Sequence, residues 1–106
     1  MINSIVGEAT TLRGDFELNG ILRIDGVFEG SVKGHSQVLV GEKGKAFLDL
    51  EADEIIIGGK VEGTIRVRGK VKMLPSGYLK GEVTAKNLII EPGAFFCGKC
   101  KMIKEG

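Results

Sequence analysis

The single histidine is the first residue of this chain that could support catalysis or metal binding. His35 lies in a polar stretch, Lys-Gly-His-Ser-Gln at residues 33–37. A catalytic zinc usually takes three protein ligands, and in one large class all three are histidines. Because the chain has one histidine, the sequence does not favour such an enzyme. We interpret His35 as a solvated bend residue.

Two cysteines form the second candidate, in the segment Cys97-Gly-Lys-Cys100 with C-x-x-C spacing. A redox motif of this type is expected near a βαβ pattern, whereas this segment alternates like a strand. A structural zinc site needs a second pair of ligands, which the sequence lacks. We therefore interpret Cys100 as a core residue and Cys97 as a surface residue, both reduced, and predict neither a metal nor a cofactor.

Acidic residues recur near one corner of the repeats described below. They could form a row of carboxylates, but their Lys and Arg neighbours favour a solvated face. No Ser/His/Asp set, phosphate-binding loop or dinucleotide fingerprint accompanies them. The sequence therefore predicts no catalytic residue, and we expect that the protein is not an enzyme. The acidic residues in question are Asp15, Glu29, Asp49, Glu62 and Glu82.

All of these residues belong to an internal repeat. The pattern L-x-I-x-G-x-F-x-G-x-V at residues 22–32 returns, 33 residues later, as I-x-I-x-G-x-V-x-G-x-I at residues 55–65. The same shift continues to Leu88 and Ile90. Self-similarity at a fixed period indicates a stack of similar units that contact mainly their neighbours.

Within a unit, every second residue from 55 to 67 is apolar or glycine, which is the period of a β-strand with one buried face. Each unit splits into two coils, because apolar pairs begin at residues 22, 38, 55, 71 and 88. An earlier coil fits residues 6–16. The sequence predicts an all-β solenoid of about six coils of 16–17 residues, each with three short strands, and little or no helix. The expected inner column is Leu12, Leu22, Val38, Ile55, Val71 and Leu88.

Glycines mark the corners of the coils. Two coils turn quickly, at residues 24–26 and 57–59, and two others insert two residues, at 40–44 and 73–77. Glycine and proline adopt the backbone angles of such turns at low cost. Inward glycines recur at one level, where we expect a side chain to crowd the axis. Examples are Gly30, Gly63 and Gly81.

Composition and length suggest one domain. We expect a short segment at residues 1–4, the β-helix at residues 5–102 and a tail at residues 103–106. The net charge is +1, with 15 basic and 14 acidic residues interspersed, so no basic cluster indicates nucleic acid binding. The first residues lack the pattern of a signal peptide or a membrane span, and we expect a cytoplasmic protein.

Three segments resemble the bactofilin family: IVGEATTLRGDF at residues 5–16, LRIDGVFEG at 22–30 and LIIEPGAFFCGKCKM at 88–102. The resemblance implies a right-handed parallel β-helix. It also implies a bacterial cytoskeletal protein that polymerises end to end without nucleotide. Such proteins often lie on the inner face of the cytoplasmic membrane and position cell-wall enzymes that shape the cell.

Two other classes of protein remain open. A hexapeptide-repeat acyltransferase has a left-handed β-helix, an 18-residue coil and a catalytic histidine, so the 16–17-residue period and the isolated His35 count against it. An unassembled β-solenoid that acts as a binding scaffold is the second alternative. A monomer of 11.3 kDa in solution would support that reading.

The two ends of the solenoid are the expected functional surfaces. Soluble solenoids carry a polar cap at their ends, and the stretches before residue 5 and after residue 102 are too short to form one. A shift of 35 residues places residues 61, 63 and 65 on 96, 98 and 100, so Phe96 should point inward with no coil above it. The resemblance implies that a phenylalanine of the last coil belongs to the polymerisation surface. The predicted interface is Phe96, Phe95, Leu12, Phe16, Cys100 and Met102.

A second predicted contact is with the membrane. Met1, Ile2, Ile5 and Val6 are apolar, and some relatives use a brief N-terminal segment in this way. The expected partners are therefore further copies of the chain, the inner membrane surface and cell-wall enzymes, without nucleotide or nucleic acid.

Overall fold

The computed structural model describes the backbone of residues 2–103 and the side chains of residues 5–103. Within these residues the chain forms twelve β-strands and no helix. Each coil consists of one short strand followed by one long strand. The short strands are β1 (Ile2–Val6), β3 (Gly20–Ile24), β5 (Ser36–Val40), β7 (Glu54–Ile57), β9 (Lys70–Met73) and β11 (Asn87–Ile90). The long strands are β2 (Thr11–Glu17), β4 (Val27–Lys33), β6 (Lys45–Ala52), β8 (Lys60–Val67), β10 (Tyr78–Ala85) and β12 (Phe95–Met102).

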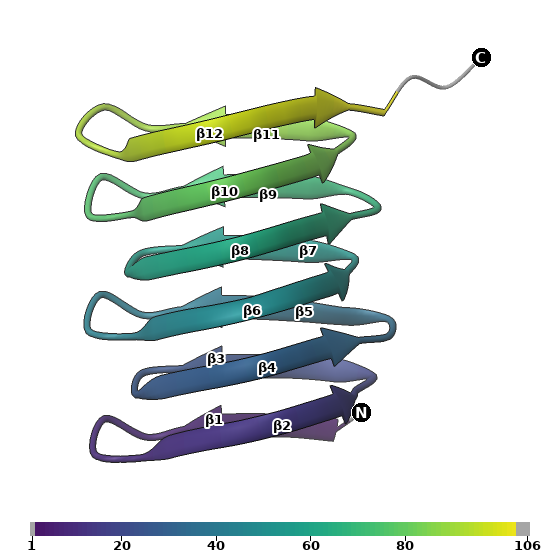
Figure 1. Ribbon diagram of the computed structural model, residues 1–106, viewed down its shortest axis with the longest axis vertical. Helices are drawn as coiled ribbons and strands as arrows, with labels where there is room; N and C mark the ends of the chain where they lie inside the picture. Colours follow the sequence, from purple (N-terminus) through teal and green to yellow (C-terminus); the bar gives the residue numbers. More distant parts are fainter. Residues whose placement is uncertain (1, 104–106) are drawn as a thin grey trace.

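The strands form two parallel six-stranded sheets, one of short strands and one of long strands. In Figure 1 the long strands run from left to right across the front, the chain returns behind them, and successive coils rise from bottom to top. This path is a right-handed helix. The predicted fold, a right-handed parallel β-helix of about six coils, is therefore confirmed.

The prediction of three strands per coil is wrong. Each coil has two strands, because the long strands remain in the hydrogen-bonded ladder through the glycine level where we expected a corner. Gly63, for example, lies in the middle of β8 and is paired with Leu48 and Gly81 on its two neighbours.

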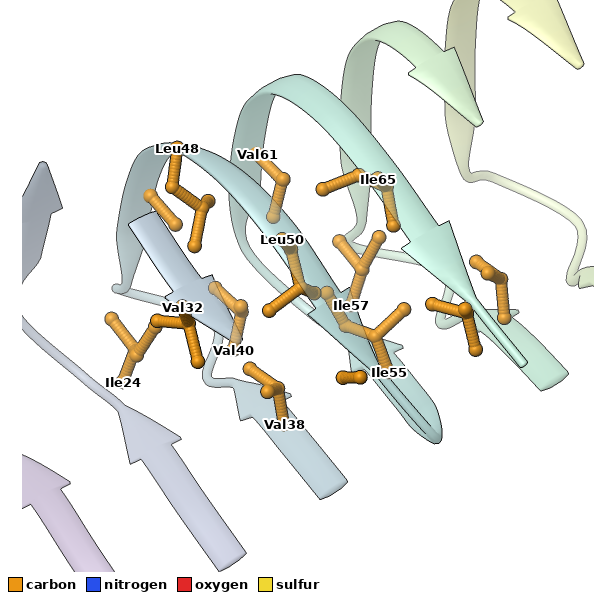
Figure 2. Packing of buried hydrophobic residues seen from close by; sticks show 14 of the residues in the cluster. Ile24, Val32, Val38, Val40, Leu48, Leu50, Ile55, Ile57, Val61 and Ile65 are labelled. Carbon is orange, nitrogen blue, oxygen red and sulfur yellow. The ribbon is translucent and has the colours of Figure 1, made fainter. Parts of the chain in front are cut away.

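The core fills the space between the two sheets, into which alternate side chains of both sheets point (Figure 2). One column runs through Leu22, Val38, Ile55, Val71 and Leu88, as predicted. Leu12 was assigned to this column wrongly. It lies on a long strand and is aligned with Phe28, whereas Ser4 is the residue aligned with Leu22.

The turns that lead from short to long strands follow the predicted difference in length. Residues 25–26 and 58–59 make the two short turns, and residues 41–44 and 74–77 make four-residue turns, each closed by a hydrogen bond between its first and last residue. The last coil also has a four-residue turn, at 91–94. This insertion explains why the last long strand is displaced by 35 rather than 33 residues. The longer loops stand out at the left of Figure 1.

The recurring glycines do not crowd the axis. Gly30, Gly63 and Gly81 have φ angles of 132°, 133° and 135°. Residues that carry a Cβ atom rarely adopt such angles. A Cβ atom on Gly63 would overlap the carbonyl oxygen of Leu48 in the preceding coil. The close contact therefore lies along the stack, between neighbouring backbones, and sets how tightly the coils approach.

Candidate functional site

The C-terminal end of the β-helix exposes side chains that elsewhere would be core. Phe96 continues the column of Leu79, Cys100 that of Val83, and Met102 that of Ala85. The three residues below are at most 1% exposed, whereas Met102 is 46% exposed because no coil covers it. We call this set the C-terminal end surface. It consists of Leu88, Ile90, Ala94, Phe96, Cys100 and Met102.

The N-terminal end has the same property on its long strand. Leu12 and Phe16 continue the columns of Phe28 and Val32, two residues that are buried. Phe16 remains 39% exposed, and its ring packs on that of Phe28 with centroids 5.7 Å apart.

Phe95 lies beside the C-terminal end surface and points outward, as predicted. Its ring stacks on Tyr78 with centroids 5.0 Å apart and an interplanar angle of 11°. On the coil that precedes Tyr78, the ammonium of Lys60 lies 5.5 Å from the centroid of the Tyr78 ring. This distance is within the range of a cation–π contact. Lys60, Tyr78 and Phe95 thus stack on the outer face of successive coils. Phe95 lies on the last coil and is 51% exposed.

The six predicted interface residues therefore fall at the two ends. Phe96, Cys100 and Met102 lie together on the C-terminal end surface, Phe95 lies at its rim, and Leu12 and Phe16 lie on the opposite end. The interpretation of Cys100 as a core residue is wrong, since it is exposed on the uncovered coil. Leu88, Ile90 and Ala94 also belong to the C-terminal end surface but were not among the predicted interface residues. The alternation of apolar residues in the last coil could have indicated Leu88 and Ile90.

The predicted membrane residues have different environments. Met1 lies outside the described residues, and the side chain of Ile2 is not among those described. Ile5 is 73% exposed, whereas Val6 is 3% exposed, because Val6 continues the core column of Ile24 and Val40. In the part of the chain that the structure describes, no helix is long and apolar enough to cross a membrane.

His35 belongs to a polar network at the turns that lead from long to short strands. Its Nδ1 lies 3.4 Å from Oδ1 of Asp53, to which Nε of Arg68 donates a 2.8 Å hydrogen bond. Arg68 also donates to the carbonyl of Gly34 at 2.6 Å and to Glu51 at 3.2 Å. The hydrogen bond from Arg68 lowers the pKa of Asp53, and His35 acts in the same direction against the opposing effect of burial. The network joins the turns that follow β4, β6 and β8. We interpret it as structural and call it the clamp.

The cysteines and carboxylates do not converge. Cys97 points outward and Cys100 points along the core column, in keeping with their three-residue spacing on a strand. The acidic residues do not form a single row, because Asp15, Asp49 and Glu82 lie in one outer column while Glu29 and Glu62 lie in another. Among residues 5–103, no group of three or more His, Cys, Asp or Glu side chains could hold a metal ion.

The fold and the uncovered apolar ends define a right-handed β-solenoid with two candidate association surfaces. The family model for bactofilins, described as polymer-forming cytoskeletal, matches residues 4–101. The chain therefore belongs to the bactofilin family, as its resemblance predicted.

Two relatives come from Myxococcus xanthus (strain DK1622). Bactofilin BacO is 26% identical over 102 residues, which cover 96% of this chain and 81% of BacO. Bactofilin BacP is 26% identical over 100 residues, which cover 94% of this chain and 42% of BacP. No solved structure matches the chain.

Proposed function

We propose that the β-helix of residues 5–102 assembles end to end into filaments without a nucleotide. The observation that carries this proposal is the change in burial along the core columns. Leu79 and Val83 are at most 1% exposed, whereas Phe96, which continues the first column, is only half-buried, and Cys100, which continues the second, is exposed. A further copy stacked on that coil would cover them.

Three contributions favour such stacking. Full burial of a large apolar side chain contributes about 1.5–3 kcal/mol, and covering the half-buried Phe96 would gain part of this. The outer edges of β11 and β12 present backbone N–H and C=O groups that an added coil would pair. The Tyr78–Phe95 stack would gain a further neighbour on the exposed face of Phe95. The family description as polymer-forming cytoskeletal supports the same proposal.

We further propose that the filament is a non-enzymatic cytoplasmic scaffold for the cell-shape or cell-wall machinery at the inner membrane surface. Membership of a cytoskeletal family supports this. The outward position of Cys97 on β12, far from the exposed His35–Asp53–Arg68 network, is consistent with it. The right-handed path counts against a hexapeptide-repeat acyltransferase, whose β-helix is left-handed.

The test is negative-stain electron microscopy and pelleting of the purified protein in nucleotide-free buffer. We expect filaments for the wild type. Phe96→Arg should remain folded by circular dichroism but lose long filaments, because assembly would bury an unpaired charge. Phe47→Arg is the matched control, since Phe47 is a half-buried, outward residue in the middle of the rod. It should form normal filaments. A wild type that stays monomeric at high concentration would favour the unassembled scaffold and refute the proposal.

A further inference from the structure

The outer face of the short-strand sheet carries one column of residues in continuous register from the first coil to the last. We call this column the outer stripe. It consists of Ile5, Arg23, Leu39, Ile56, Lys72 and Ile89.

The outer stripe has the same pattern from either end. It reads apolar, basic, apolar, apolar, basic, apolar. If copies join end to end, as proposed above, and the short-strand sheet continues across the joint, the column continues as two apolar residues and one basic residue. At about 4.8 Å per coil the pattern repeats every three coils, or about 14 Å. The filament would thus present one uninterrupted stripe along one side.

The stripe is accessible. Ile5 is 73% and Ile89 43% exposed, and Ile21, in the neighbouring column on β3, is 38% exposed. Leu39 and Ile56 are half-buried and lie next to each other in the middle of the rod. Isolated exposed apolar residues need no explanation, but a periodic row of them indicates an interaction surface.

The charges on the stripe restrict what can cover it. Arg23 forms a 2.8 Å ion pair with Asp25, whereas Lys72 makes no ion pair among the described residues. If the same stripe of a second filament packed against it in register, Lys72 would face either Lys72 or Arg23 of that copy. Like charges placed directly opposite destabilise such packing. A flat surface with negative charges above an apolar layer has no such conflict.

We propose that the outer stripe is the side on which the filament lies on a bilayer that contains anionic lipids. This inference rests on the proposed end-to-end assembly. The four apolar members of the stripe, Leu39 and Ile56 among them, would face the boundary between headgroups and acyl chains, and Lys72 and Arg23 would lie at the lipid phosphates. One subunit offers few contacts, but a filament multiplies them through a high effective concentration. The membrane contact then lies along a sheet face rather than at the start of the chain alone.

The test is flotation of nucleotide-free filaments with vesicles of phosphatidylglycerol and phosphatidylcholine, compared with phosphatidylcholine alone. We expect wild-type filaments to float with the anionic vesicles. The double variant Leu39→Thr, Ile56→Thr should lower the bound fraction at least tenfold with filaments retained, because threonine suits strands. Phe47→Thr on the opposite sheet is the matched control and should float like the wild type.

A charge substitution gives an independent measurement that does not alter packing in the middle of the stripe. Lys72→Gln should weaken flotation and make it less sensitive to salt, whereas Lys80→Gln on the outer face of β10 should not. Wild-type filaments that do not float, that float equally with neutral vesicles, or that float unchanged in both stripe variants would overturn the inference. Micrographs without wild-type filaments would instead contradict the proposed assembly.

Discussion

Ser36 is a buried polar residue in an otherwise apolar core. It is 2% exposed, and its hydroxyl has no hydrogen-bond partner among the described residues. Burying a hydroxyl without a partner costs about 1–3 kcal/mol. We therefore expect Ser36→Ala to raise the free energy of unfolding by about 1 kcal/mol.

Urea unfolding in the Phe96→Arg background, which should prevent growth of long filaments, measures this effect. Ser31→Ala is the control, because the Ser31 hydroxyl is exposed and donates a 2.7 Å hydrogen bond to Asp15. It should change stability little. A clear loss of stability in Ser36→Ala would mean that the hydroxyl forms a hydrogen bond in solution, for example with water.

Asp53 should make stability depend on acid pH. Arg68 holds the pKa of the Asp53 carboxyl below its ordinary value. The ionised group therefore stabilises the fold above the unfolded-state pKa of about 3.9, and this stabilisation disappears as the pH falls through the lower folded-state pKa. We expect Asp53→Asn to be less stable than its parent at pH 6, with a difference that shrinks as the pH falls below the unfolded-state pKa of the carboxyl. Asp49→Asn, at a site without an ion pair among the described residues, serves as the comparison in pH-dependent thermal unfolding.

His35 and Cys97 should be dispensable for assembly. His35 lies in the clamp at the turns and its side chain is 76% exposed, while Cys97 points away from the end surface. Pelleting of His35→Ala and Cys97→Ser should match that of the wild type. Zinc retained in stoichiometric amount after dialysis, and lost in Cys97→Ser, would instead indicate a metal site.

For single residues, the sequence predicted which side chains point inward but not which outward side chains contact each other. Phe96 was placed correctly because strand alternation fixes its direction. The contact of Asp53 with Arg68 joins residues 15 positions apart through exposed side chains, and no periodic pattern indicates such a pair.

The glycine level is the most restrictive feature of the long strands. Gly63 combines a φ of 133° with a position where a Cβ would overlap the Leu48 carbonyl oxygen. Gly63→Ala should therefore lower the free energy of unfolding by about 3 kcal/mol or more. Gly7→Ala is the control, because the nearest atom to its added Cβ is 3.7 Å away. Thermal unfolding followed by circular dichroism compares the two, and equal melting temperatures would show that the coils can move apart.

The coils and their turns could be predicted because each depends on local pattern and glycine chemistry. The number of strands per coil could not, since a glycine in a long strand and a glycine at a corner look alike in sequence. The same ambiguity led to the expectation that Gly30, Gly63 and Gly81 crowd the axis. The structure resolves it through their backbone angles and the adjacent carbonyl groups.

The whole molecule is a rod whose sides are closed by hydrogen-bonded sheets and whose ends are apolar. Family membership could be predicted from three segments and is shown by the family model. The outer stripe could not be predicted from the sequence. Its members lie 16–18 residues apart and become neighbours only through the parallel register of the strands.

Sedimentation velocity of end-blocked variants shows whether the two ends mediate assembly. Phe16→Arg should block the N-terminal end and Phe96→Arg the C-terminal end, each leaving the other end intact. If like ends join, each variant alone stops at a dimer. If opposite ends join, each alone is a monomer and a mixture of the two forms dimers. We expect one of these two patterns, with long polymers in the wild type. Long polymers in both variants would contradict this expectation.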